Sequence, residues 1–324
     1  MNPFEPHRSL RNKHIMTVAA TYWRRNFPHL PLGIDRFFEV EPGTKLLGHC
    51  HWQAEPKEHA TIVLVHGLEG SSDSGYMLGI AEKAYRVGFN AIRLNQRNCG
   101  GSEKLTATLY NSGLSGDYHA VLHELITRDA LPDLFFCGYS MGGNLVLKMA
   151  GELGAAAPRQ LRGVAAVCPS LDLAACADAL ELPTNFFYHR HFVVGLKRRY
   201  RRKAQQLPET YSLAGLARIR SLRQFDNIIT APRSGYRDAV DYYDRASAIR
   251  VAGQIRVPTL IITAKDDPFV PVNSFTDPAI TGNRNIQLVT TEHGGHCAFV
   301  SRTNGPERFW AEARVVEFCR KQLR

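Results

Sequence analysis

Short runs of apolar and β-branched residues alternate along the chain with longer segments in which apolar residues recur at helical spacing. Each short run has the length and composition of a buried strand. Alternation of this kind, from about residue 35 to about residue 323, is typical of a mostly parallel sheet with helices on both faces. We therefore predict an α/β fold. The clearest strand-like runs lie at residues 61–65, 131–137, 161–168, 257–264 and 285–291.

The run at 131–137 leads into the pentapeptide Gly138-Tyr139-Ser140-Met141-Gly142, and a helical pattern follows at 144–153. A serine at a sharp strand-to-helix turn forms a nucleophile elbow, because the glycines remove side chains that would collide across the turn. The helix N-terminus then favours negative charge near the serine oxygen. A glycine-rich turn can also be a simple connection, but the strand before it and the helix after it favour Ser140 as a nucleophile.

A serine hydroxyl is a weak nucleophile at neutral pH, so it needs a base, and the base needs an orienting acid. Two later strand-like runs end in suitable residues. The first is followed by Asp266 and Asp267, and the second by His293 and His296 around two glycines. The order serine, acid, histidine along the chain is the order found in α/β-hydrolases.

The run at 61–65 stops at His66, in a glycine-rich loop that continues to Ser72. This loop resembles the one after the third strand of α/β-hydrolases, where a backbone N–H works with that of the residue after the nucleophile to bind an oxyanion. The resemblance implies the amides of Leu68 and Met141 as the two donors. One such donor contributes about 3–4 kcal/mol of transition-state stabilisation. We interpret His66 itself as a structural anchor of the loop.

The resemblance extends beyond these loops. Over about residues 10–320 the chain resembles the YheT-like branch of α/β-hydrolases, AB-hydrolase family 4. The stretch from Arg223 to Tyr243 carries features specific to this branch. One departure is Asn98, where the branch more often has glycine, but asparagine also tolerates a left-handed backbone. The matching segments are 66–72, 138–144, 223–226, 230–232, 235–236, 242–243, 265–269 and 292–296.

The resemblance implies one α/β-hydrolase domain spanning residues 1–324, with a mostly parallel central sheet, helices on both faces and an inserted helical cap at 171–250. It further implies a serine carboxylic-ester hydrolase that works through an acyl-enzyme on short- to medium-chain acyl esters or lipid esters. The partner is then a small-molecule or lipid ester.

The resemblance also chooses between the paired candidates. Asp267 matches an Asp-x-x-Val-Pro pattern and His296 matches a Gly-Gly-His pattern. We therefore expect Ser140, Asp267 and His296 to form a catalytic triad. Asp266 is expected to face away on the same turn, and His293 to support the loop.

Two other functions remain as alternatives. An acyltransferase would use the same triad and an alcohol in place of water, and a dry, capped pocket would favour it. The chain lacks the His-x-x-x-x-Asp motif of dedicated acyltransferases. A non-catalytic ligand-binding protein is disfavoured, because such reuse of the fold usually loses a member of the triad.

About ninety residues between the strand-like runs at 161–168 and 257–264 fit no strand pattern. Their aromatic stretch at 185–194 either lines a pocket or forms the core of the cap. The run at 197–203 has six basic residues among seven. It is most often a solvated helix face, with contact to anionic lipid as the alternative. We expect no nucleic-acid partner, since no recognition module surrounds the run.

Cysteine usage and charge bound the remaining possibilities. The seven cysteines are odd in number and contain no Cys-x-x-Cys pair, which predicts reduced thiols and a cytoplasmic location. No metal-ligand spacing and no phosphate-loop or dinucleotide motif occurs, so we expect no metal and no cofactor. The net charge of +10 leaves peripheral contact with an anionic membrane surface open, and the oligomeric state is open too.

The N-terminal apolar patch at 15–23 is interrupted by threonines and ends at Arg24 and Arg25 without a small-residue cleavage site. It therefore fails as a signal peptide or a membrane span. We expect a soluble protein whose N-terminal segment packs across the mouth of the active site or touches a membrane surface.

Overall fold

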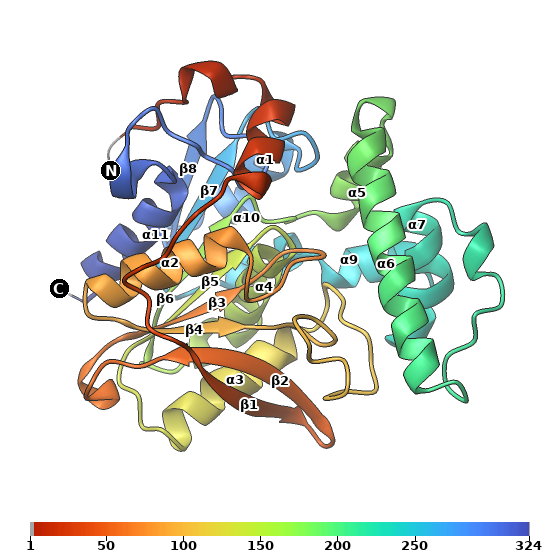
Figure 1. The fold of residues 1–324 in the computed structure, drawn as a ribbon, viewed down its shortest axis with the longest axis horizontal. Coiled ribbons are helices and arrows are strands. Elements are labelled where there is room, and N and C mark those ends of the chain that lie inside the picture. The colour runs from red at the N-terminus through yellow and green to blue at the C-terminus, as the bar shows by residue number, and fades with distance from the viewer. Residues whose placement is uncertain (1–2, 324) are drawn as a thin grey trace.

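The computed structural model describes residues 3–323 and is built around an eight-stranded sheet (Figure 1). The strand order is β1-β2-β4-β3-β5-β6-β7-β8. From β4 to β8 all neighbours are parallel, and only β1 and β2 at one edge are antiparallel. The predicted mostly parallel sheet is confirmed. The strands are β1 (Ile34–Glu41), β2 (Thr44–His51), β3 (Thr61–Val65), β4 (Asn90–Leu94), β5 (Leu134–Tyr139), β6 (Leu161–Val167), β7 (Thr259–Ala264) and β8 (Ile286–Thr291).

Apolar layers cover both faces of the sheet, because successive side chains of a strand point to opposite sides. In β3, Val63 and Val65 pack in the layer formed with α3 and α4, whereas Ile62 and Leu64 pack in the layer formed with α2 and α11. The helices are α1 (Lys13–Tyr22), α2 (Gly75–Arg86), α3 (Ser115–Thr127), α4 (Met141–Leu153), α5 (Leu173–Glu181), α6 (Phe186–Gln206), α7 (Leu222–Phe225), α8 (Ala231–Arg233), α9 (Ala239–Ala246), α10 (Pro278–Thr281) and α11 (Trp310–Lys321).

Between β6 and β7 the chain leaves the sheet and forms no strand among its described residues. We call residues 171–250 the helical segment; it contains α5 to α9 and one π-helical turn, Asp226–Thr230. Figure 1 shows this segment to one side of the sheet. We call the rest of the described chain, which contains the sheet, the sheet domain. Side-chain contacts attach the helical segment to it: the Tyr211 hydroxyl donates to the Ala107 carbonyl oxygen at 2.6 Å.

The basic run at 197–203 lies on α6, and the prediction of a solvated helix face is wrong for two of its members. Lys203 is only 2 % exposed and donates to the carbonyl oxygen of Thr106 at 2.7 Å. Arg199 donates to the Glu69 carboxylate at 3.2 Å. These two side chains anchor the helical segment to loops of the sheet domain. The exposed basic residues are Arg198, Arg201 and Arg202.

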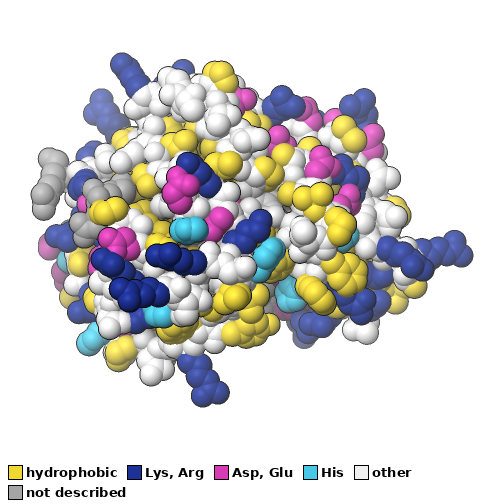
Figure 2. All heavy atoms as spheres, turned by 90° about the horizontal axis from the view of Figure 1, so that it is seen from above, with side chains coloured by type: hydrophobic (Ala, Val, Ile, Leu, Met, Phe, Trp, Pro, Cys, Tyr) yellow, Lys and Arg dark blue, Asp and Glu magenta, His cyan; other side chains and the backbone are white. Residues whose placement is uncertain are grey.

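The aromatic residues of the stretch at 185–194 lie in three different environments: in a cavity wall, in a packed ring contact and on the surface. Phe192 lines a cavity, and the Tyr188 ring packs on Phe269 with centroids 5.2 Å apart. Phe186 and Phe187, at the start of α6, are 53 % and 82 % exposed. In Figure 2, seen from above, apolar side chains gather on the part of the surface formed by the helical segment, and basic side chains project beside them.

Two smaller expectations concern the backbone and the membrane. Asn98 has a φ of +61°, which confirms that this asparagine takes the left-handed conformation. Within residues 3–323, every helix is too short or too polar to cross a bilayer.

Candidate active site

Ser140 lies at the sharp turn between β5 and α4. Its φ of +52° and ψ of −118° place a non-glycine residue in a strained region of the backbone map. A Cβ atom at Gly138 would overlap the carbonyl group of Gly142, so the turn requires glycine there. The Ser140 hydroxyl makes no hydrogen bond to the described part of the chain and lines a cavity. The predicted elbow geometry is therefore present.

The loop after β3 lies directly against this turn, since a Cβ at Gly67 would be 3.1 Å from the Ser140 Cβ. The amides on both sides of Leu68 donate to tyrosine hydroxyls at 3.0 and 3.3 Å. Within residues 3–323, neither the N–H of Leu68 nor that of Met141 has an acceptor. Both residues line the same cavity as Ser140. Two unpaired donors thus lie beside the candidate nucleophile.

His66 holds this loop in place. Its ring is fully buried, accepts from the Gln96 N–H at 3.1 Å and lies 2.8 Å from the Gly67 carbonyl oxygen. Burial lowers the pKa of His66 to about 4, so the ring stays neutral. The expected role of His66 as an anchor is confirmed.

The loops after β7 and β8 bring Asp267 and His296 together. One oxygen of the Asp267 carboxylate lies 2.8 Å from His296 Nδ1, and the other accepts from the N–H groups of Phe269 and Val270 at 3.0 and 2.9 Å. The Asp267 side chain is fully buried. These contacts fix the carboxylate, and the carboxylate orients the imidazole.

The neighbouring pair has a different task. Asp266 accepts from the Gly295 N–H at 2.9 Å and lies 3.3 Å from His293 Nδ1. The His293 side chain is 42 % exposed, against 11 % for His296. Asp266 and His293 therefore contact each other and hold the loop after β8, which is the support expected of His293, while Asp267 and His296 face the interior.

The N-terminal helix α1 also supports this loop. The Thr17 hydroxyl accepts from the His296 N–H at 2.9 Å. On the same helix the His14 ring stacks on Tyr188 of α6, with centroids 5.7 Å apart. The helix α1 of the N-terminal segment therefore packs against the loop that carries His296 and against α6.

Within the described residues, Ser140 and His296 share no hydrogen bond and are linked through the Val167 carbonyl oxygen and the Cys297 thiol. The Ser140 N–H donates to the Val167 carbonyl oxygen at 2.9 Å, and Cys297 Sγ lies 3.6 Å from the same oxygen. His296 Nε2 in turn lies 3.6 Å from Cys297 Sγ. Catalytic hydrogen bonds are often long before substrate binds and tighten in the complex.

The ionisation of His296 reflects its neighbours. Burial opposes a charge on the imidazole, but the Asp267 carboxylate outweighs burial and raises the pKa of His296. Burial likewise opposes a thiolate at Cys297, yet the contacts with Cys168 and with the His296 charge lower the pKa of that thiol. Asp267 therefore favours the imidazolium, the form that a base takes after accepting a proton from a serine.

A cavity separates Ser140 from the helical segment and encloses about 910 Å³, its open mouth included. Apolar side chains from both regions make up most of its wall. From the sheet domain come Leu68, Met141, Phe269 and Val270, and from the helical segment come Leu173, Leu180, Phe192, Leu196 and Phe225. Such a wall suits an apolar chain.

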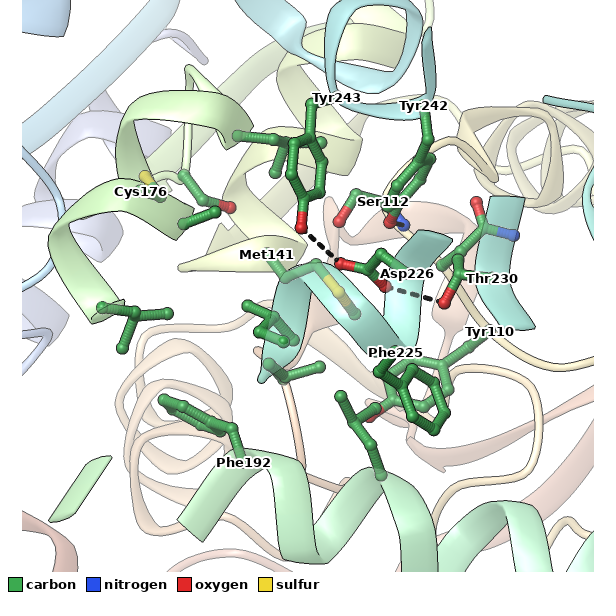
Figure 3. Close-up of a pocket in the computed structure, with 18 of the residues that line it drawn as sticks. Tyr110, Ser112, Met141, Cys176, Phe192, Phe225, Asp226, Thr230, Tyr242 and Tyr243 are labelled. Atoms are coloured by element: carbon green, nitrogen blue, oxygen red, sulfur yellow. Dashed lines mark hydrogen bonds between the residues drawn. The ribbon is translucent and has the colours of Figure 1, made fainter. Parts of the chain in front are cut away.

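One part of the cavity wall is polar. Figure 3 shows Tyr243 and Thr230 directed at the carboxylate of Asp226, and their hydroxyls donate to it at 2.8 and 2.7 Å. Burial raises the pKa of Asp226 to about 6. Asp226 therefore carries a proton more readily than an exposed aspartate.

The comparisons with known proteins agree with this geometry. Residues 60–303 match the family model described as alpha/beta hydrolase fold. This chain is an α/β-hydrolase. It is 31 % identical to YheT of Escherichia coli (strain K12), over 99 % of this chain and 94 % of that one. It is 30 % identical to phospholipase ABHD3 of Mus musculus, over 74 % of this chain and 58 % of that one. The esterase Pf2001 of Pyrococcus furiosus has the same fold, with a TM-score of 0.61 at 15 % identity, covering 100 % of this chain and 99 % of the other.

Three features of this hydrolase escaped the sequence analysis. The first is the buried carboxylate of Asp226. Its segment was named from the sequence only as a match to the family branch, because local sequence does not show that a carboxylate is buried. Arg199, which also lines the cavity, was hidden in the basic run. The third feature is the approach of Cys168 to Cys297 and His296. No metal-ligand spacing shows this group in the linear sequence, since Cys168 is over 120 residues away.

Proposed function

We propose that this α/β-hydrolase is a serine carboxylic-ester hydrolase with Ser140, His296 and Asp267 as its triad. One observation carries the proposal: a strained serine with an unpaired hydroxyl opens into an apolar cavity beside two unpaired amide donors. Names of relatives that mention esters or phospholipids support the same class of reaction.

In the proposed reaction the Ser140 oxygen attacks the ester carbonyl carbon, and its proton passes to His296 Nε2. The imidazole reaches the serine by turning away from Cys297. Asp267 keeps the proton on Nδ1 and stabilises the imidazolium. The tetrahedral oxyanion accepts hydrogen bonds from the amides of Leu68 and Met141. Collapse returns the proton to the leaving alkoxide and leaves an acyl-enzyme, which water then hydrolyses with His296 as base.

The cavity supports short- to medium-chain acyl esters or lipid esters as substrates. Its wall is mainly apolar with a few polar groups, which is the usual lining of a pocket that binds a small apolar ligand. We propose that the helical segment, residues 171–250, serves as the cap that covers the acyl chain.

One face of α6 supports peripheral contact with an anionic membrane surface. Phe187, Val194, Arg198 and Arg201 are all exposed, and their spacing of seven, four and three residues puts them on one side of the helix. Apolar and cationic side chains together suit the boundary between lipid tails and anionic headgroups.

A fluorophosphonate probe, which reacts with activated serines, tests the nucleophile. We expect labelling of Ser140 in the wild-type protein and none in Ser140→Ala, whose turnover of p-nitrophenyl esters falls by at least about 10⁴-fold. Ser170→Ala, which removes another hydroxyl from the same cavity, keeps the label. Undiminished labelling of Ser140→Ala by intact mass would refute the assignment.

A panel of p-nitrophenyl esters of increasing acyl length then tests the substrate class. We expect turnover to peak at short or medium chains and to yield free acid. The same panel with an added alcohol distinguishes transfer from hydrolysis: a new ester as the main product would make the protein an acyltransferase.

A further inference from the structure

Three possible metal ligands converge beside the candidate base. Cys168 follows β6, and His296 and Cys297 are adjacent in the loop after β8. His296 Nε2 and the two sulfur atoms all lie within 4.8 Å of one another. The Cys297 N–H donates to Cys168 Sγ at 3.4 Å, which holds the two cysteines together.

The distance between two of the ligand atoms suits a tetrahedral metal ion, and the third ligand atom lies within 4.8 Å of both. Zinc binds sulfur at about 2.3 Å and imidazole nitrogen at about 2.0–2.1 Å, so at a tetrahedral angle these two ligand atoms are about 3.6 Å apart. Cys297 Sγ and His296 Nε2 are 3.6 Å apart. The histidine is also prepared for a metal, because Asp267 holds its Nδ1 at 2.8 Å. A carboxylate on the other ring nitrogen is the usual support of a zinc-binding histidine.

Two of the three ligand residues are partly exposed. The His296 side chain is 11 % exposed and Cys297 is partly buried, whereas Cys168 closes the inner side. Two thiolates and an imidazole are ligands for thiophilic ions, while Mg²⁺ and Ca²⁺ prefer oxygen.

We propose that Cys168, His296 and Cys297 form an inhibitory site for a thiophilic divalent cation of the Zn²⁺ type. Binding displaces two protons, one from the Cys168 thiol and one shared by the Cys297 thiol and the His296 imidazole, so that two thiolates and the Nε2 lone pair hold the ion. That lone pair is the one that accepts the serine proton, so the bound ion blocks the base. The inhibitory effect rests on the function proposed above; the binding of the metal does not.

Two measurements on the full-length protein test the site. The first is the stoichiometry of Zn²⁺ by native mass spectrometry, together with the thiolate-to-metal absorption of the Co²⁺ form. The second is turnover of a soluble p-nitrophenyl ester against Zn²⁺ concentration. We expect one ion per chain, at least a tenfold loss of turnover at saturation, and recovery on adding EDTA. Mg²⁺ at the same concentration leaves turnover unchanged.

Cysteine variants place the ion. Cys168→Ser and Cys297→Ser should each raise the Zn²⁺ concentration for half-inhibition by at least about tenfold, scored against each variant's own metal-free rate. Cys176→Ser, which removes another thiol from the cavity wall, should respond like the wild type.

Each of the other possible outcomes contradicts one part of the proposal. Equal inhibition of all three variants would show that zinc acts elsewhere. If one ion binds with thiolate absorption but turnover is unchanged, the metal site is supported and its inhibitory role is refuted. Absence of bound metal refutes the site itself. A protein that binds Co²⁺ through thiolates but never turns over an ester would refute the proposed function instead.

Discussion

The sheet domain and the helical segment face the same cavity, but they are held in place by different forces. Ser140, Asp267 and His296 follow strand ends, and the strands are positioned by the main-chain hydrogen bonds of the sheet. The helical segment has no strand to join that ladder. It is attached by side chains, such as Lys203 and Tyr211, that donate to carbonyl oxygens of distant loops.

This difference teaches where each kind of substitution acts. The proposed reaction depends on a few side-chain atoms at the strand ends, and the sheet holds those side chains in place. Substitutions of these side chains should therefore lower turnover more than stability. The helical segment depends on long-range side-chain contacts, so changes to those contacts should alter stability more than turnover. The predictions below test that division, from the largest expected effect to the smallest.

The two adjacent aspartates test the rigid frame most sharply. Asp267→Asn replaces the oxygen that faces His296 Nδ1, and loss of the orienting carboxylate costs about 10⁴-fold in turnover in a serine hydrolase. Asp266→Asn should lose less than about tenfold in turnover, since the partners of the Asp266 carboxylate among residues 3–323 are His293 and the Gly295 N–H. Steady-state kinetics of both purified variants on one soluble ester measure this. If the losses are reversed, Asp266 is the acid and the proposed triad is wrong.

Lys203 tests the attachment of the helical segment. Lys203→Met removes a buried ammonium that donates to the carbonyl groups of Glu103 and Thr106. Hydrogen bonds to charged groups contribute about 1.5–3 kcal/mol each, so loss of the two bonds should lower the free energy of unfolding by about 3–6 kcal/mol. Urea unfolding measures it. Arg201→Gln changes an exposed residue of the same run and should alter the free energy of unfolding by less than about 0.5 kcal/mol. Equal losses in the two variants would mean that the buried contacts of Lys203 do not stabilise the protein more than an exposed arginine does.

The buried carboxyl group of Asp226 should make the stability of the protein depend on pH. Its pKa is raised from 3.8 to about 6 in the folded chain, so between these values the folded state keeps a proton that the unfolded state has released. Stability should therefore fall as pH rises from about 4 to about 6, by up to roughly 3 kcal/mol. Asp226→Asn should lose this dependence. Thermal unfolding of both proteins across that range measures the difference, and parallel curves would contradict a raised pKa.

The outward arginines should have the smallest effect on chemistry. Replacing Arg198, Arg201 and Arg202 by glutamine should leave turnover of a small soluble ester within about threefold, because these side chains are exposed. Binding to anionic vesicles should fall, and wild-type binding should weaken steeply with salt, since screening acts beyond about 8 Å at physiological ionic strength. A large loss of soluble-ester turnover would place these arginines in the active site.

The sequence by itself determined the sheet and the local motifs. Buried strands show as continuous apolar runs, and the elbow at Ser140 requires glycines within two residues on each side, so both signals are local. Resemblance then selected Asp267 over Asp266 and His296 over His293, and the contacts of all four residues agree with that choice.

Tertiary structure alone decided what surrounds those motifs. Whether a lysine in a basic run is solvated or buried depends on which loop faces it, and Lys203 meets carbonyl groups about 100 residues away in the chain. The buried carboxylate of Asp226 and the approach of Cys168 to Cys297 likewise arise from distant segments. A side chain's burial and partners are set by packing between elements, and neither periodicity nor spacing along the chain encodes that packing.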